Sequence, residues 1–166
     1  MNKMILIMVF DKNLEYLLFC KRAKNPYKGK LNFVRGKVRY DEHSKIGAYR
    51  ELEEETGIRR GDIDLHRMME LKFTAFPEHD SKLIVYAGIL DKPAITTNLK
   101  EELNPLEWLP VTGVNFWDTN LFAGDGNIGY FIVEALRVIG VLDSEFILDG
   151  NIIRRPNYTK EAHDGE

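Results

Sequence analysis

Apolar residues gather in short runs along the chain as far as Val111, and most of these runs are too short to be helices. Each run is bounded by polar or turn-forming residues, which is typical of strands. The predicted strands are Met4–Phe10, Glu15–Cys20, Leu31–Val38, Leu65–Phe76, Lys82–Leu90 and Leu106–Val111, with a short one at Phe146–Leu148. Short polar connections after Phe10 and Phe76 indicate a hairpin and then a second strand pair.

Two other segments repeat their apolar residues every three or four positions, as amphipathic helices do. The segment from His43 to Thr56 has good helix formers and no proline, and Gly57 is a plausible C-terminal stop. Its expected apolar face contains Ile46, Ala48, Tyr49 and Leu52. A second helix, expected to pack on the sheet, is predicted by Ile128, Phe131, Ile132, Ala135, Leu136 and Ile139. Strands with two main helices predict an α/β sandwich of the α+β kind.

Length and composition narrow the class of protein. The 166 residues suit one domain, which we expect over residues 1–150, followed by a polar tail over 151–166 that frays. A net charge of −3 argues against stable nucleic-acid binding. Cys20 is the only cysteine and lies in an apolar run, so we expect it to be buried in a cytoplasmic protein. No apolar run is long enough to span a membrane.

The first predicted helix carries a cluster of acidic residues. Glu51, Glu54 and Glu55 are related by three and four positions, so they share one face, whereas Glu53 lies roughly opposite. Their repulsion must be offset, and Arg50 offsets part of it by reaching Glu54 one turn away. The remaining oxygen ligands suit Mg²⁺ or Mn²⁺. The alternative for any acidic helix is a face that is simply solvated.

A longer pattern decides between these alternatives. It runs from Gly36 through Glu42 to Arg50-Glu51-Leu52, and then through Glu54-Glu55 to Gly57-Ile58. With these spacings it resembles the motif of the Nudix hydrolase family, and every defined position is filled. The resemblance implies the Nudix α/β/α sandwich with a mixed sheet. It also implies metal-dependent hydrolysis of nucleoside diphosphates linked to another group, which favours the metal site over a solvated face.

The resemblance also implies roles for particular residues. In the family, carboxylates at the positions of Glu51, Glu54 and Glu55 bind the metal, often with the backbone carbonyl at the position of Arg35. A carboxylate from a later loop frequently adds a ligand or orients the attacking water. Glu102 is the best candidate here and Glu101 the second. Glu51 and Glu102 are both candidates for the general base.

Arg35 departs from the family pattern, in which small or glycine residues usually precede the motif. A side chain there restricts the backbone that should face the metal. The guanidinium could instead reach a substrate phosphate. Glu42 is expected to be structural, with Arg50 holding Glu54 in place.

Residues outside the motif set the substrate. The stretch Lys30–Val38, with Trp117 and Asp118 later, resembles the subgroup that hydrolyses oxidised purine nucleoside triphosphates such as 8-oxo-dGTP. There, an asparagine at the position of Asn32 reads the base edge, a tryptophan at Trp117 lines the pocket, and groups near Asp118 and Asn120 assist. The phosphates would meet cations such as Lys21, Arg22 and Lys37. The alternatives are a strand-end role for Asn32, core packing for Trp117 and plain exposure for the cations.

The predicted reaction gives a nucleoside monophosphate and pyrophosphate, with a small nucleotide as the partner and a monomer or homodimer as the assembly. Hydrolysis of ADP-ribose or of another nucleoside diphosphate linked to a further group is an alternative that fits less well, since ADP-ribose hydrolases usually carry a proline about 16 residues beyond the motif and Pro77 is a near miss. An alternative of another class is a domain that senses a nucleotide without catalysis.

A second glycine pattern needs its own interpretation. Gly124, Gly126 and Gly129 have the spacing of a dinucleotide-binding fingerprint, but no buried strand is predicted before them. We expect instead a loop capped by Asp125 or Asn127 at the second helix, or one that borders the substrate pocket.

Overall fold

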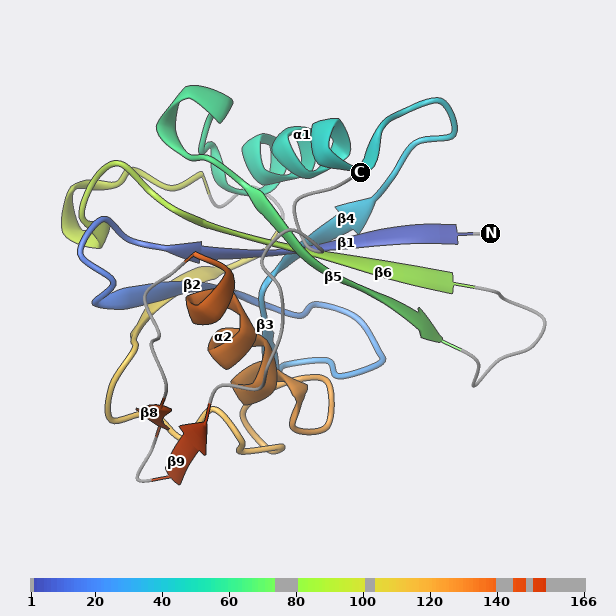
Figure 1. The fold of residues 1–166 in the computed structure, drawn as a ribbon. Helices are drawn as coiled ribbons and strands as arrows, with labels where there is room; N and C mark the ends of the chain where they lie inside the picture. Colours follow the sequence, from blue (N-terminus) through green and yellow to red (C-terminus); the bar gives the residue numbers. More distant parts are fainter. Residues whose placement is uncertain (1, 74–80, 101–103, 140–144, 149–150, 155–166) are drawn as a thin grey trace.

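The computed structural model describes residues 2–73, 81–100, 104–139, 145–148 and 151–154. Seven strands form one mixed sheet with two helices packed on it (Figure 1). Its strands are β1 (Asn2–Phe10), β2 (Tyr16–Lys21), β3 (Leu31–Asn32), β4 (Val34–Lys37), β5 (His66–Phe73), β6 (Ser81–Ile89) and β7 (Leu106–Pro110). The helices are α1 (Ser44–Thr56) and α2 (Asn127–Val138), and short 3₁₀ helices lie at Arg60–Asp62 and Ala94–Thr96.

Strand β1 organises the sheet because it has neighbours on both of its edges. It runs parallel to β6 along its whole length, and β5 follows as an antiparallel neighbour of β6. On its other edge, residues 4–7 of β1 pair with β4, while its last residue, Phe10, pairs with Leu17 of β2. Strands β3 and β4 are separated only by Phe33, but β3 pairs with β2. The chain therefore changes partner at Phe33, beside the clefts described below.

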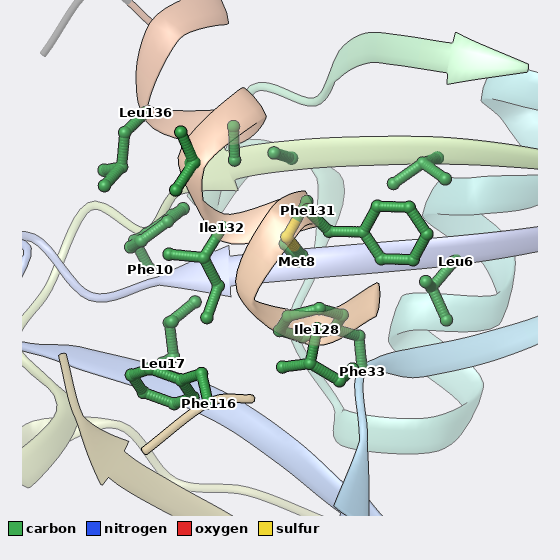
Figure 2. Close-up of a cluster of buried hydrophobic side chains, with 14 of the residues drawn as sticks. Leu6, Met8, Phe10, Leu17, Phe33, Phe116, Ile128, Phe131, Ile132 and Leu136 are labelled. Carbon is green, nitrogen blue, oxygen red and sulfur yellow. The ribbon is translucent and has the colours of Figure 1, made fainter. Parts of the chain in front are cut away.

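The two faces of β1 are buried under different helices, because alternate side chains of a strand point to opposite faces. Ile5, Ile7 and Val9 belong to the core beneath α1. Leu6, Met8 and Phe10 belong to the core beneath α2, where Phe131, Ile132 and Leu136 cover them (Figure 2). The helices thus lie on opposite faces of the sheet, which confirms the predicted sandwich with a mixed sheet.

Most predicted elements are confirmed, and four details differ. Ile46 is 53% exposed, so it does not belong to the apolar face of α1. Cys20 is half-buried rather than buried. Helix α2 begins after Gly126, and no side chain caps it. The predicted tail begins with a strand, β9 (Asn151–Arg154), paired with β8 (Glu145–Leu148), so the expectation that it frays from 151 is wrong.

Among the described residues, no helix is long and apolar enough to cross a membrane.

Candidate active site

Helix α1 is fixed to the sheet by polar contacts as well as by its apolar side chains. The Tyr49 hydroxyl accepts a hydrogen bond from the Leu65 backbone N–H at 2.9 Å, and the hydroxyls of Ser44 and Tyr86 lie 2.7 Å apart. The helix ends at Gly57, whose φ of 81° is the left-handed conformation that glycine adopts readily. These anchors set the orientation of the acidic side chains: Glu54 is exposed, whereas Glu51 and Glu55 are partly buried.

Arg50 pairs with three carboxylates at once. Its Nη1 donates to Glu51 Oε1 at 3.0 Å and to Glu54 Oε2 at 3.1 Å. Its Nε and Nη2 donate to the two oxygens of Glu42 at 2.7 and 2.9 Å. The predicted Arg50–Glu54 pair is confirmed, and the fork-like pairing with Glu42 adds to it. These bonds to Arg50 lower the pKa of Glu42 from its ordinary value to about 2.

Steric crowding explains why the first residue of the motif, Gly36, is a glycine. The backbone of Gly36 lies so close to Glu51 that a Cβ atom at this position would come within 2.0 Å of Glu51 Cδ. The next residue contributes too, since the Lys37 backbone N–H donates to Glu51 Oε1 at 3.2 Å. Strand β4 therefore fixes the Glu51 carboxylate, and only glycine leaves room for it.

Glu55 lies at the inner end of the acidic face, in the wall of a cleft. Burial raises the pKa of its carboxyl group, the negative charges of Glu51 and Glu54 raise it further, and a hydrogen bond with Asn104 lowers it. This first cleft has a volume of about 310 Å³. Most of its lining residues are of polar or charged types, although much of the wall area is formed by their apolar atoms: Cys20, Arg22, Ala23, Lys24, Asn32, Phe33, Arg35, Glu55 and Asn104. Burial raises the pKa of the Cys20 thiol to about 11, so this cysteine is a protonated wall residue near neutral pH.

The acidic residues fit a divalent cation in their chemistry. Carboxylate oxygens are the ligands that Mg²⁺ and Mn²⁺ prefer, and their mutual repulsion is the kind that a cation relieves. As they stand, Glu51 and Glu54 each give one oxygen to Arg50, and Glu55 bonds to Asn104. Among the described residues, no three His, Cys, Asp or Glu side chains converge as a ready-made metal site. A bound cation would have to compete with these protein partners.

A second cleft, of about 360 Å³, shares Asn32 and Arg35 with the lining of the first. Its walls are mainly apolar and include residues of β1, β6 and α2. The lining residues are Met4, Ile5, Leu6, Pro26, Tyr27, Asn32, Arg35, Leu83, Ala123, Gly124, Asp125, Asn127, Ile128 and Phe131. Together the clefts offer a charged compartment beside an apolar one.

Asn32 and Arg35 are the predicted substrate residues that the structure brings to the clefts. Asn32 ends β3, and its Oδ1 accepts a hydrogen bond from the Phe33 backbone N–H at 2.8 Å. The strand-end role is therefore real, and the same side chain still borders both clefts. Burial lowers the pKa of the Arg35 guanidinium, and the nearby positive charge of Arg22 lowers it further.

The other predicted substrate residues lie elsewhere. Trp117, Asp118 and Asn120 border neither cleft. The indole of Trp117 packs so tightly on α2 that a Cβ at Gly129 would come within 2.6 Å of it. Asp118 closes a turn by accepting the Asn120 backbone N–H at 2.8 Å. Lys21 is exposed and borders neither cleft, whereas Arg22 borders the first.

Some predictions fall on parts of the chain that the structure does not describe. Glu101 and Glu102 lie outside the described residues, and so does Pro77. Two positions after Glu102, the described residue Asn104 forms a hydrogen bond with Glu55.

Residues that sequence reasoning did not assign to the site also border the clefts, chiefly Tyr27, Asn104, Asp125 and Asn127. One signal was present in the sequence, since Gly124–Asn127 is the glycine-rich segment that we interpreted as a loop bordering a pocket. Gly124, Asp125 and Gly126 all have positive φ values, of 82°, 53° and 98°, which explains the glycines. The preceding strand, β7, ends at Pro110 and does not lead directly into these glycines, which argues against the dinucleotide-binding interpretation.

Solved structures of several proteins are similar to this one. The NUDIX domain of Shewanella oneidensis NrtR, in complex with ADP ribose, has a TM-score of 0.62 at 13% identity, covering 82% of this chain and 87% of that one. The E. coli dihydroneopterin triphosphate pyrophosphohydrolase has a TM-score of 0.61 at 16% identity, covering 80% and 96%. A bifunctional NMN adenylyltransferase/ADP ribose pyrophosphatase from Francisella tularensis, complexed with AMP and a Mn ion, has 0.63 at 16%, covering 84% and 42%.

At these identities the structures show a shared fold and no more. Comparison with curated protein sequences finds no match. The family model for the NUDIX domain matches residues 3–128, which is most of the chain and includes the whole motif, both strand pairs and the start of α2. The chain therefore belongs to the Nudix family, whose hydrolases act on phosphorus-containing anhydrides and in general use divalent metals.

Proposed function

We propose that this protein is a Mg²⁺- or Mn²⁺-dependent pyrophosphohydrolase of nucleoside triphosphates, with oxidised purine nucleotides such as 8-oxo-dGTP as the candidate substrates. Water would attack a phosphorus atom and break an anhydride bond, releasing nucleoside monophosphate and pyrophosphate. One observation carries the proposal: the carboxylate face of α1 meets, through Glu55, a cleft lined by several charged residues, and a second cleft with mainly apolar walls shares Asn32 and Arg35 with it. Phosphates and base then have separate compartments.

The first cleft suits the phosphate chain. Arg22, Lys24 and Arg35 provide positive charge in its wall, and a guanidinium is well shaped to bind phosphate oxygens. Glu51, Glu54 and Glu55 would hold the cation, joined in our proposal by the Arg35 carbonyl and Glu102. When bound, such a cation neutralises phosphate charge and lowers the pKa of its water. Arg50 pairs with both Glu51 and Glu54 and so holds their carboxylates together.

The second cleft suits a purine. Its apolar walls, formed in part by Leu6, Leu83 and Phe131, cover the flat faces of a base. Within the described chain, the Asn32 Nδ2 makes no hydrogen bond, so it is available to a base edge.

We assign an indirect role to the segment containing Trp117, Asp118 and Asn120, since it runs beside β3. The Leu31 backbone N–H donates to the Leu121 carbonyl at 2.9 Å, and Lys30 Nζ donates to the Thr119 carbonyl at 2.6 Å. These bonds position the strand that carries Asn32. Lys21, which is exposed on β2, would act on phosphates only from outside the first cleft.

A substrate panel with matched variants tests the proposal. Wild type, Glu54→Gln and Glu53→Gln are incubated with Mg²⁺ and 8-oxo-dGTP, dGTP, ADP-ribose, diadenosine polyphosphates or nucleotide sugars. Glu54→Gln should lose about 10³-fold in kcat, since a metal-held transition state is worth several kcal/mol. Glu53→Gln is the control, because Glu53 is exposed and its ion pair with Arg59 is long, at 3.8 Å. If the wild-type protein hydrolyses none of these compounds, the proposal that it is an enzyme is wrong.

ADP-ribose is the second candidate substrate, because the similar Shewanella oneidensis domain was solved in complex with it. It also contains a diphosphate and a purine, so it would occupy the same two compartments. If only ADP-ribose is hydrolysed, the proposed substrate is wrong, but the proposed metal-dependent mechanism still stands. Tight binding of a nucleotide without any turnover would favour a sensing domain instead.

A further inference from the structure

One hydrogen bond joins two segments that line the second cleft. The Tyr27 hydroxyl donates to Asp125 Oδ2 at 2.6 Å, between residues 98 positions apart in the sequence. Both side chains border the cleft, Tyr27 from the loop of residues 22–30 and Asp125 from the segment before α2. We propose that this bond is a clasp that fixes the loop in the position the substrate requires, which makes Tyr27 and Asp125 positioning residues for specificity. The inference rests on the proposed function and extends it.

The backbone at both ends of the clasp supports a functional role. Tyr27 has a φ of 67° and Asp125 a φ of 53°, in the left-handed region that non-glycine residues avoid. Such conformations persist where surrounding contacts hold them, and they concentrate at ligand sites. The clasp joins two such residues across a cleft, although its atoms are exposed to water. A hydrogen bond without a function would not require the left-handed backbone conformation at both of its residues.

The loop behaves as one unit because its ends and its turn are hydrogen bonded. The Arg22 N–H donates to the Lys30 carbonyl at 2.9 Å, and the Gly29 N–H donates to the Arg22 carbonyl at 2.8 Å. Arg22 Nε also donates to the Pro26 carbonyl at 2.7 Å. A displacement at Tyr27 is therefore transmitted to Arg22.

The loop contributes to the walls of both clefts, so the clasp affects the positions of residues in both. Arg22 and Lys24 border the first cleft, and Pro26 and Tyr27 border the second. The clasp thus sets the position of the phosphate-binding cations relative to the apolar compartment. A substrate that fills both clefts depends on this spacing in its ground state and transition state alike, so losing the clasp should raise KM and leave kcat nearly unchanged.

Two measurements on Tyr27→Phe, Asp125→Ala and the double variant test the clasp. The first is the rate of tryptic cleavage inside residues 21–30, followed by mass spectrometry without nucleotide, since Lys21, Arg22, Lys24, Lys28 and Lys30 are potential cleavage sites. The second is kcat and KM for 8-oxo-dGTP. Each single variant should raise both the cleavage rate and KM about tenfold, the size expected for one hydrogen bond to a charged acceptor. The double variant should match the singles, because they remove the same bond.

The controls separate the clasp from general effects. Tyr40→Phe removes the hydroxyl of a fully exposed tyrosine and should change neither quantity. Asp125→Asn keeps an acceptor oxygen and tolerates a positive φ, so it should recover most of the wild-type behaviour. Unchanged cleavage in Tyr27→Phe would overturn the clasp, and so would single-variant KM effects that multiply in the double variant. If wild type hydrolyses nothing, the proposed function fails, while the cleavage rates still decide the clasp.

Discussion

Helices α1 and α2 cover opposite faces of the same sheet, and they are built for different purposes. Ten of the 12 residues of α2 are buried, and most of these are apolar. Only six of the 13 residues of α1 are buried, and they include Ser44, Gly47 and Thr56. Helix α1 instead carries the charged Arg50 network with Glu42, Glu51 and Glu54, in which Glu54 is the most exposed member. One helix mainly contributes apolar burial to the fold, and the other mainly organises charged groups.

Each helix also has a glycine contact that shows what its face must accommodate. At α1, the close neighbour of Gly36 is the Glu51 carboxylate, a group of the site. At α2, the close neighbour of Gly129 is the indole of Trp117, a group of the core. The same kind of substitution on the two faces should therefore damage different properties, activity at α1 and stability at α2.

The largest expected effect is a loss of stability at α2. Ile132 is completely buried beneath this helix (Figure 2), and Ile132→Ala should lower the free energy of unfolding by about 3 kcal/mol through lost burial and a cavity. In a chain of this size, that lowers Tm by about 6–12 °C. Ile46→Ala on α1 is the matched control, because Ile46 is 53% exposed. Thermal unfolding measures both, and equal losses would contradict the division between the helices.

The next effect is a loss of activity at β4. Gly36→Ala places a methyl group where Glu51 lies, so the carboxylate must move. A displacement of this size costs about 100-fold in kcat, equivalent to about 2.7 kcal/mol. Gly61→Ala is the control, since nothing lies within 4 Å of a Cβ there. Retention of full activity by Gly36→Ala would show that the position of Glu51 is not critical.

A smaller effect is expected from the glycine of α2. In Gly129→Ala the new Cβ would come within 2.6 Å of the Trp117 ring, and the core must shift to admit it. Such overpacking should cost about 2 kcal/mol of stability, or about 4–8 °C in Tm. Well below Tm, kcat should stay within a factor of about two. A large fall in kcat without loss of Tm would instead place Trp117 in the substrate pocket.

The comparison also explains which features sequence patterns could predict. The end of α1 at Gly57, the Arg50–Glu54 pair and the acidic face depend on contacts within one helix turn, so spacing alone defines them. Ile46 misled the prediction because its spacing to Tyr49 is helical, but the buried face of α1 is formed by Gly47, Ala48, Tyr49 and Leu52. At Gly47, an added Cβ would lie 3.1 Å from Ile5.

The clefts could not be predicted, because they are formed by strands and loops that are far apart in the sequence and whose pairing a local sequence pattern does not reveal. Asn32 and Arg35 reach both clefts because β3 and β4 pair with different strands on either side of Phe33. Tyr27 and Asp125 meet across most of the chain. Trp117 was predicted to line the pocket because of its residue type. It packs against the core instead, where Gly129 leaves room for its indole. The part of the site that lies on one helix was predictable, and the part assembled between elements was not.

The smallest expected effect is a pH-dependent loss of stability when the ion pair between Glu42 and Arg50 is removed. Glu42 has a pKa of about 2 in the folded protein, below its ordinary value of 4.5, because Arg50 binds its ionised form. A lowered pKa contributes stability above the ordinary value and loses it as pH falls towards the folded value. Glu42→Gln should therefore have a lower Tm than wild type near neutral pH, measured without added metal. The difference should shrink from about pH 5 to about pH 2.

Glu53→Gln distinguishes this pair from ordinary surface charge. Glu53 is exposed, and its contact with Arg59 is long, so the Tm of Glu53→Gln should follow that of wild type at every pH. A Tm difference for Glu42→Gln that stays constant with pH would mean that shape, rather than charge, connects Glu42 to Arg50. In that case the network on α1 would contribute to packing as α2 does, and the contrast between the two helices would be one of degree.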